Sequence, residues 1–107
     1  MKTINYKNET IFKEIQTVQK ATELQKTNFI HIIHMSLNPG DYIEMHSTPM
    51  DVSFYISHGI LDMQIGDETQ KVKAGTLVES PKSIPHGFKN NYESKVEILV
   101  IKHLTTK

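Results

Sequence analysis

The chain has 107 residues, the length of a single domain, and its 12 basic side chains balance its 12 acidic ones. This balance argues against a basic surface for nucleic acid or membranes, and the lack of arginine removes the planar group that clamps phosphates. With no cysteine, disulfides and thiolate metal sites are excluded. The opening MKTINYKNET lacks an apolar signal segment, so we expect a cytoplasmic protein.

The first 27 residues predict N-terminal strands. Thr3 to Lys7 and Ala21 to Thr27 favour extended structure, and the second of these segments is polar enough to lie near a sheet edge. Residues 8–20 are ambiguous, because Asn8 is a good helix cap but the apolar residues after it make only a weak helical stripe. We therefore expect at most one short turn of helix there.

Two longer segments predict strands that are covered on both sides. Residues 28–37 and 96–103 are rich in β-branched residues and are apolar on both faces. In a chain this small, the outer cover is most easily a second copy, which predicts a homodimer. Within the first segment, His31 and His34 fall on opposite faces and cannot belong to one site.

Short strands separated by turn residues fill the middle of the chain. Alternation places Tyr42, Glu44 and His46 on one face of their strand, and Val52 and Phe54 on the inward face of the next. About eight to ten strands with no long helix predict an all-β sandwich or barrel. The segments that predict strands here are 41–46, 52–57, 60–65, 69–73, 76–80 and 88–91.

The segment from Ser80 to Asn90, SPKSIPHGFKN, predicts a rigid turn that holds a histidine. Pro81 and Pro85 fix the backbone and donate no hydrogen bond, so the segment is neither a helix nor a central strand. His86 follows directly, where the chain can re-enter a sheet. A side chain held in this way is well placed to do chemistry.

Two stretches, Gly40 to Gly59 and Gly75 to Asn90, together resemble the motifs of the cupin superfamily. In the first, five residues separate Gly40 from His46, and in the second, five residues separate Gly75 from Pro81. The resemblance covers residues 28–103 and implies a double-stranded β-helix, or jelly-roll barrel, within a single domain of residues 1–107.

The same resemblance shows degenerate metal-binding motifs. Of the family's four ligands, His46 and His86 are present, whereas Thr48 replaces the second histidine and Val52 replaces the glutamate. The glycine that follows the proline of the second motif is Ser83 here. Two imidazoles alone hold a divalent metal weakly, so a site for Mn, Fe, Ni or Zn at His46 and His86 is one of two alternatives. The other is a pocket that has lost its metal.

Without a metal, the two histidines become polar anchors of an apolar pocket. Desolvation and mutual repulsion should then lower both pKa values and leave at least one ring neutral at pH 7. The residues expected to form this small-molecule pocket are His46, Thr48 and His86 as anchors, with Val52, Phe54 and Phe88 as walls.

The leading functional prediction is therefore a cupin that binds or senses a small molecule without catalysis. The alternatives are a metal-dependent enzyme, oxygenase- or isomerase-like, with an altered two-histidine site, or a metal-free isomerase that uses His46 or His86 as its base. A third hypothesis is a purely structural dimeric barrel.

Overall fold

The computed structural model describes residues 1–7 and 20–104. This part of the chain contains no helix and nine strands. The strands are β1 (Lys20–Lys26), β2 (Ile30–Leu37), β3 (Tyr42–His46), β4 (Asp51–His58), β5 (Ile60–Ile65), β6 (Glu68–Lys73), β7 (Thr76–Ser80), β8 (His86–Lys89) and β9 (Val96–His103). The all-β prediction is confirmed.

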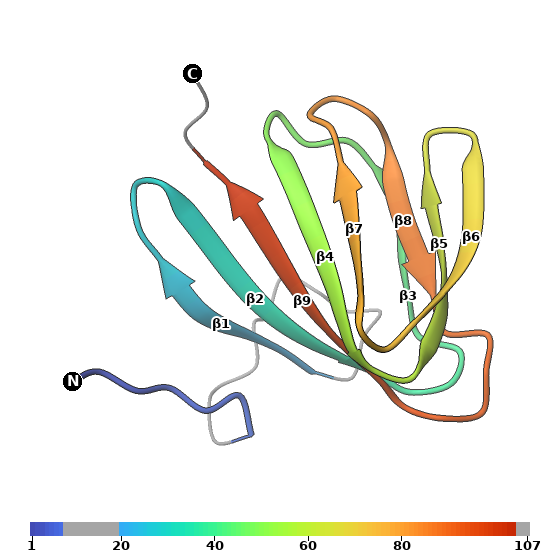
Figure 1. The fold of residues 1–107 in the computed structure, drawn as a ribbon, viewed down its shortest axis with the longest axis horizontal. Helices are drawn as coiled ribbons and strands as arrows, with labels where there is room; N and C mark the ends of the chain where they lie inside the picture. The colour runs from blue at the N-terminus through green and yellow to red at the C-terminus, as the bar shows by residue number, and fades with distance from the viewer. Residues whose placement is uncertain (8–19, 105–107) are drawn as a thin grey trace.

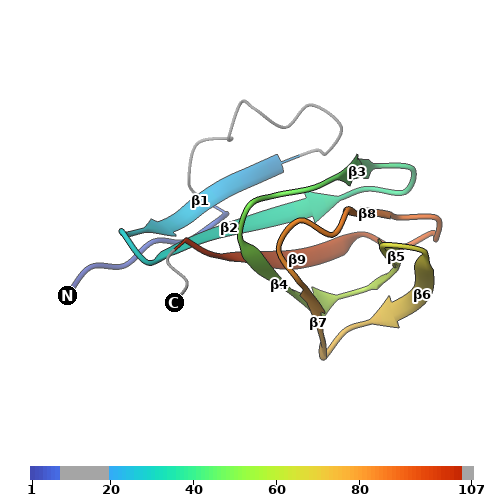
Figure 2. The same ribbon diagram turned by 90° about the horizontal axis from the view of Figure 1, so that it is seen from above.

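The strands form two antiparallel sheets that face each other. The first sheet has the order β1-β2-β9-β4-β7, and the second has the order β3-β8-β5-β6. In Figure 1, β1 and β6 lie at opposite sides of the molecule. β7 is an end strand of the first sheet, and β6 is an end strand of the second. Figure 2 shows the two sheets on either side of a shared interior.

Side chains that alternate along the strands fill this interior. On β4, Val52, Phe54 and Ile56 are buried at 2%, 2% and 0% exposure, as the alternation predicted. Phe54 pairs with Val78 on one side and Val100 on the other, so three strands contribute neighbouring inward side chains. The buried apolar core consists of Ala21, Ile33, Met35, Leu37, Val52, Phe54, Ile56, Leu61, Met63, Val72, Phe88, Val96, Ile98 and Val100.

Several predicted boundaries differ from the structure. Residues 1–7 contain no strand, and most of the ambiguous segment, 8–19, lies outside the described residues. Phe29 precedes β2 and is 68% exposed, so it does not share the inward face of that strand. The strand that was expected to begin at Phe88 begins at His86 instead, because the rigid turn ends at Pro85.

The outer face of the first sheet carries its own polar cluster at the β1 side. β1 is an edge strand, as predicted, and Tyr6 stacks on His34 with ring centroids 3.7 Å apart. His34 Nε2 lies 3.2 Å from Glu97 Oε1, and Ser36 Oγ donates to the same oxygen. Burial lowers the pKa of His34, while Glu97 opposes that effect.

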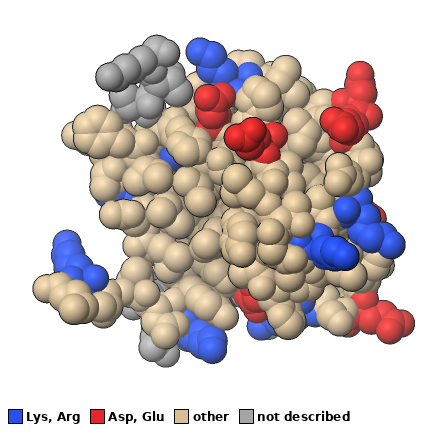
Figure 3. Space-filling model, in the orientation of Figure 1, with Lys and Arg blue, Asp and Glu red and all other residues tan. Residues whose placement is uncertain are grey.

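Among the residues that the structure describes, no helix is long and apolar enough to cross a membrane. On the face in Figure 3, lysine and acidic side chains are dispersed and stand mostly at the margin. No single-sign patch covers that face, which agrees with the balanced composition.

Candidate functional site

A β-bulge in β3 decides which face of the strand His46 occupies. Ile43 pairs with Phe88, but it is His46, not Met45, that pairs with His86, so β3 carries one extra residue between the two pairs. The bulge reverses the alternation and puts His46 on the same face as Ile43. The prediction that Tyr42, Glu44 and His46 share one face is therefore wrong. It failed because alternation does not reveal where a strand contains an extra residue.

Gly87 makes this bulge possible. A Cβ atom at position 87 would lie 2.8 Å from the carbonyl oxygen of Ile43 and 2.9 Å from the backbone nitrogen of Met45. Both atoms belong to the backbone of β3, so no side-chain rotation could relieve the clash. Glycine is needed here for close approach of two strands, since Gly87 has no positive φ.

The bulge brings the two predicted histidines together. The rings of His46 and His86 meet edge to face, with centroids 4.7 Å apart. His86 is 3% exposed, whereas His46 lies at the surface. Phe54 contacts His86 at 5.1 Å and Phe88 at 5.5 Å between centroids. The pair therefore has one ring in the core and one ring facing solvent, with predicted aromatic wall residues beside it.

Hydrogen bonds orient both rings. His46 Nδ1 lies 2.8 Å from the Glu44 carbonyl oxygen, and because a carbonyl only accepts, Nδ1 donates and Nε2 is the acceptor in the neutral ring. His86 Nδ1 lies 2.7 Å from Ser80 Oγ, a buried contact in which the hydroxyl can take either role. The His46 arrangement is the one that prepares an imidazole to accept a proton at Nε2.

The electrostatic environment keeps His86 neutral. Burial, followed by the neighbouring His46 and then Lys102, lowers the pKa of His86 from 6.5 to about 4. The predicted neutral imidazole is thereby confirmed for this ring. Lys102 pairs with Val52 on β4 and with His31 on β2, so it continues the inward row of β9 towards the histidines.

The remaining predicted pocket residues have mixed positions. Val52 is buried opposite Ser80, next to the hydroxyl that contacts His86. Thr48 Oγ1 donates to the Met50 carbonyl oxygen at 3.1 Å, so its proton is used within its own loop. The Thr48 carbonyl oxygen also accepts a hydrogen bond from the Ser83 amide, which ties the loop of β3 and β4 to the turn before His86.

The donor set does not fit a resident divalent metal. The described residues contain no group of three or more His, Cys, Asp or Glu side chains that could hold one. The acid nearest to Val52 along the chain is Asp51, which is exposed and accepts a hydrogen bond from the Lys82 amide. His46 and His86 thus supply two ligands, fewer than the three protein ligands of a catalytic zinc site.

The other histidines have structural surroundings. His31 Nε2 contacts Glu23 and His34 contacts Glu97, on opposite faces of β2 as predicted. His58 is exposed. His103 is half-buried, and its Nε2 lies 3.1 Å from Ser53 Oγ.

Three residues that support the site were not singled out from the sequence. Lys102 shares the alternation of Val96, Ile98 and Val100, and that signal could have found it. Ser80 and Gly87 gave no such signal, because their roles depend on contacts with other strands.

Comparison with known proteins agrees with this architecture. Residues 33–102 match the family described as the cupin domain. The chain belongs to the cupin family. A conserved protein of unknown function from Streptococcus pyogenes is 24% identical, with a TM-score of 0.76 and coverage of 100% of this chain and 98% of that one. A search of curated proteins found no match.

Two further solved structures share the fold at lower sequence identity. A predicted oxalate decarboxylase from Thermotoga maritima has a TM-score of 0.85 at 16% identity, covering 97% of this chain and 100% of that one. A polyketide cyclase from Streptomyces resistomycificus has a TM-score of 0.83 at 16% identity, covering 98% and 80%. At these identities the likeness establishes the fold, and their named activities differ from one another.

Proposed function

We propose that this cupin binds a small polar molecule at the His46–His86 pair and acts as a binding or sensing module. The observation that carries the proposal is the pairing of a buried, neutral His86 with an exposed His46 whose Nδ1 is already fixed. Such a pair offers oriented hydrogen-bonding groups beside apolar walls, which is the usual composition of a small-molecule site.

The surroundings favour a neutral or anionic polar group on the ligand. Lys102 is the charged residue that extends the inward row at this end of the barrel. Val52, which pairs with Lys102 from the neighbouring strand β4, has an apolar side chain. A carboxylate at that position would repel an anionic ligand, and valine does not. A ligand carboxylate or hydroxyl would therefore meet a cation and imidazole groups rather than an acid.

Acid–base catalysis without a metal is the second candidate, and the orientation of His46 favours it. A neutral His46 presents Nε2 as an acceptor, and an exposed acceptor of this kind can remove a proton from a bound substrate. An isomerase-like proton transfer would use these groups. The metal-dependent alternative is less well supported, because the described donors do not fit a metal.

Ligand and metal assays on untagged protein test these alternatives. Bound metal is measured by elemental analysis, and the melting temperature is measured with small carboxylates, sugars, Mn²⁺, Fe²⁺, Ni²⁺ and Zn²⁺. We expect stabilisation by a carboxylate or polyol that His46→Gln and His86→Gln both reduce, with His58→Gln as the exposed control. Stoichiometric metal that both site variants lose would refute the metal-free proposal. A complete lack of response to the organic panel would favour the purely structural hypothesis.

We also propose that a second copy covers the outer face of the first sheet. Leu77, Tyr55 and Leu99 form a row of paired residues across β7, β4 and β9. Leu77 is 53% exposed in the single chain. Light scattering should give a dimer mass, and Leu77→Lys should shift it towards the monomer. A monomeric wild-type protein at high concentration would contradict this proposal.

A further inference from the structure

The two sheets leave a cleft where their edge strands β6 and β7 meet. These strands are the ends of their sheets and do not pair with each other. The cleft between them has a volume of about 500 Å³. That volume lies within the range of about 300 to 1,000 Å³ that is typical of small-molecule sites.

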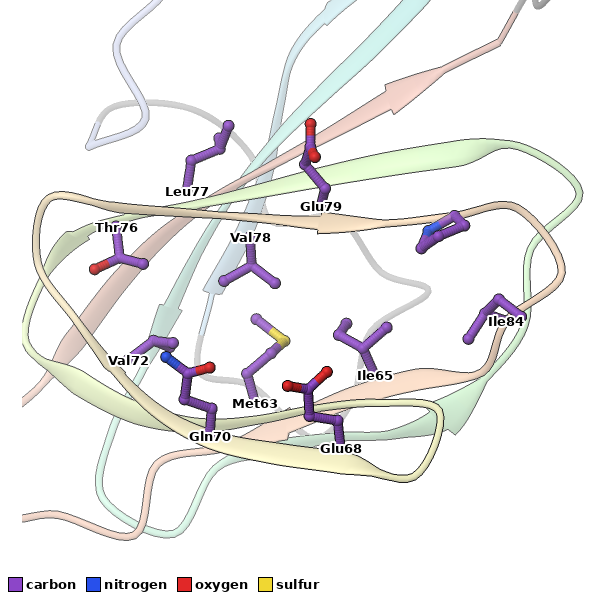
Figure 4. A pocket seen from close by; sticks show the side chains of 11 residues that line it. Met63, Ile65, Glu68, Gln70, Val72, Thr76, Leu77, Val78, Glu79 and Ile84 are labelled. Atoms are coloured by element: carbon purple, nitrogen blue, oxygen red, sulfur yellow. The ribbon is translucent and has the colours of Figure 1, made fainter.

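An apolar floor closes the inner side of the cleft. Met63 and Val72 are nearly fully buried, and Ile65 and Val78 pack against the same core. Figure 4 shows Val78 projecting from β7 towards Met63 in the opposite sheet, with Ile84 at one end of the cleft. An apolar group that entered here would rest on the side of the barrel core.

The rim of the cleft contains polar residues on the inward face of β6, where apolar core residues are expected. Glu68 pairs with Ile65 and Gln70 pairs with Met63, and both alternate in phase with buried Val72. They therefore belong to the inward row of β6 although they are polar. Figure 4 shows both side chains rising from β6 towards the cleft. A row that breaks the local pattern in this way is where function is expected.

The charge of the cleft has one sign. Its lining includes two carboxylates, on Glu68 and Glu79, and no lysine or histidine. In Figure 4, Leu77 and Glu79 project from β7 away from β6, which leaves Glu68 as the acid on the cleft side. Among the described residues, the ion pairs involve other side chains, so no lysine neutralises Glu68.

We propose that this cleft binds a small amphipathic cation, a protonated amine attached to an apolar body. The ammonium group would pair with Glu68 and hydrogen-bond to Gln70, and the apolar body would lie on Ile65 and Val78. A cation is chosen over a neutral or anionic ligand because the lining carries negative charge and no positive charge.

The cleft is separate from the histidine pair. Ile65 pairs with His86, and Val78 pairs with Phe54, so the cleft floor stands between its opening and the two aromatic residues. The two sites also prefer opposite charges, since Lys102 lies near the histidines and Glu68 lies in the cleft. A ligand for one site is thus a poor ligand for the other.

A competing explanation is that Glu68 protects an edge strand. Charged residues that point inward on an edge strand prevent it from pairing with another molecule. This explanation predicts that loss of the charge promotes association of the protein with itself and that no amine binds. The two explanations therefore differ in a measurable way.

The test is a titration of ¹⁵N-labelled protein followed by backbone NMR shifts, with hexylammonium as the probe and hexanol and hexanoate as neutral and anionic controls. We expect hexylammonium to bind in the millimolar range, with shifts centred on β6 and β7, and to bind more tightly than hexanol. Glu68→Gln should weaken binding about threefold to fivefold, and Glu79→Gln, the matched control that points away, should leave it within about twofold.

The outcomes that would overturn the proposal are equally specific. Equal binding of hexanol, or an unchanged affinity in Glu68→Gln, would show that the charge is not recognised. Shifts centred on His46 and His86 would place the amine at the other site. Self-association of Glu68→Gln without any amine binding to the wild type would support edge protection instead. His86→Gln should keep its affinity for hexylammonium, so failure at one site can be told from failure at the other.

Discussion

Acidification should destabilise this protein through His86. The pKa of His86 is about 4 in the folded chain, against 6.5 for an ordinary histidine, chiefly because the ring is buried. Between these two values the unfolded chain binds a proton that the folded chain does not, so the free energy of unfolding falls as pH falls. The contribution is fully present above pH 6.5 and is lost by about pH 4. At about 1.4 kcal/mol for each pKa unit, the loss is about 3 kcal/mol.

The measurement is chemical denaturation between pH 7.5 and pH 4 for the wild type, His86→Gln and His58→Gln. The His86 variant has lost the titrating ring, so its stability should fall about 3 kcal/mol less over this range than that of the wild type. The exposed His58 control should retain the wild-type slope. His34, whose pKa is also lowered, contributes equally to all three proteins and cancels in the comparison. Identical slopes for wild type and His86→Gln, or an NMR titration of the His86 ring near pH 6.5, would refute the reasoning.

Three further predictions follow from the site. Gly87→Ala should cost about 1–3 kcal/mol of unfolding free energy, measured by denaturation, and should remove the nuclear Overhauser contact between the rings of His46 and His86, because the new Cβ displaces β3. Ser80→Ala should cost about 1–2 kcal/mol, because it removes a buried hydrogen-bond partner of His86. Val52→Glu should lower the melting temperature without metal and recover it with Mn²⁺ or Ni²⁺, since it adds a carboxylate beside the pair; no recovery would contradict that placement.

The sequence predicted the barrel well because the barrel depends on local patterns. The alternation in β4 and the glycine turns act over a few residues, and both are readable without knowledge of distant contacts. Residues 28–37 and 96–103 were predicted to be strands, and they form the neighbouring strands β2 and β9 within the first sheet.

The candidate site was harder to predict because it depends on contacts between strands. His46 and His86 were identified from motif spacing, but the bulge that makes them neighbours requires β3 to cross Gly87. The β6–β7 cleft was not predicted either. Glu68 falls between the predicted strands 60–65 and 69–73, and only the register with Ile65 reveals that it occupies an inward position.

The geometry also explains how two histidines can stay paired without a full set of metal ligands. His46 and His86 stand on neighbouring strands of one sheet, joined by the bulge and the close approach at Gly87. Val52, where the resemblance places a metal ligand, stands on the opposite sheet. Its partner in the pairing, Ser80, lies on the same sheet as Val52 and contacts the His86 ring through its hydroxyl. None of the contacts that orient the two rings involves the side chain at position 52. The pair is held by the backbone and a hydroxyl, so its geometry does not depend on a bound metal.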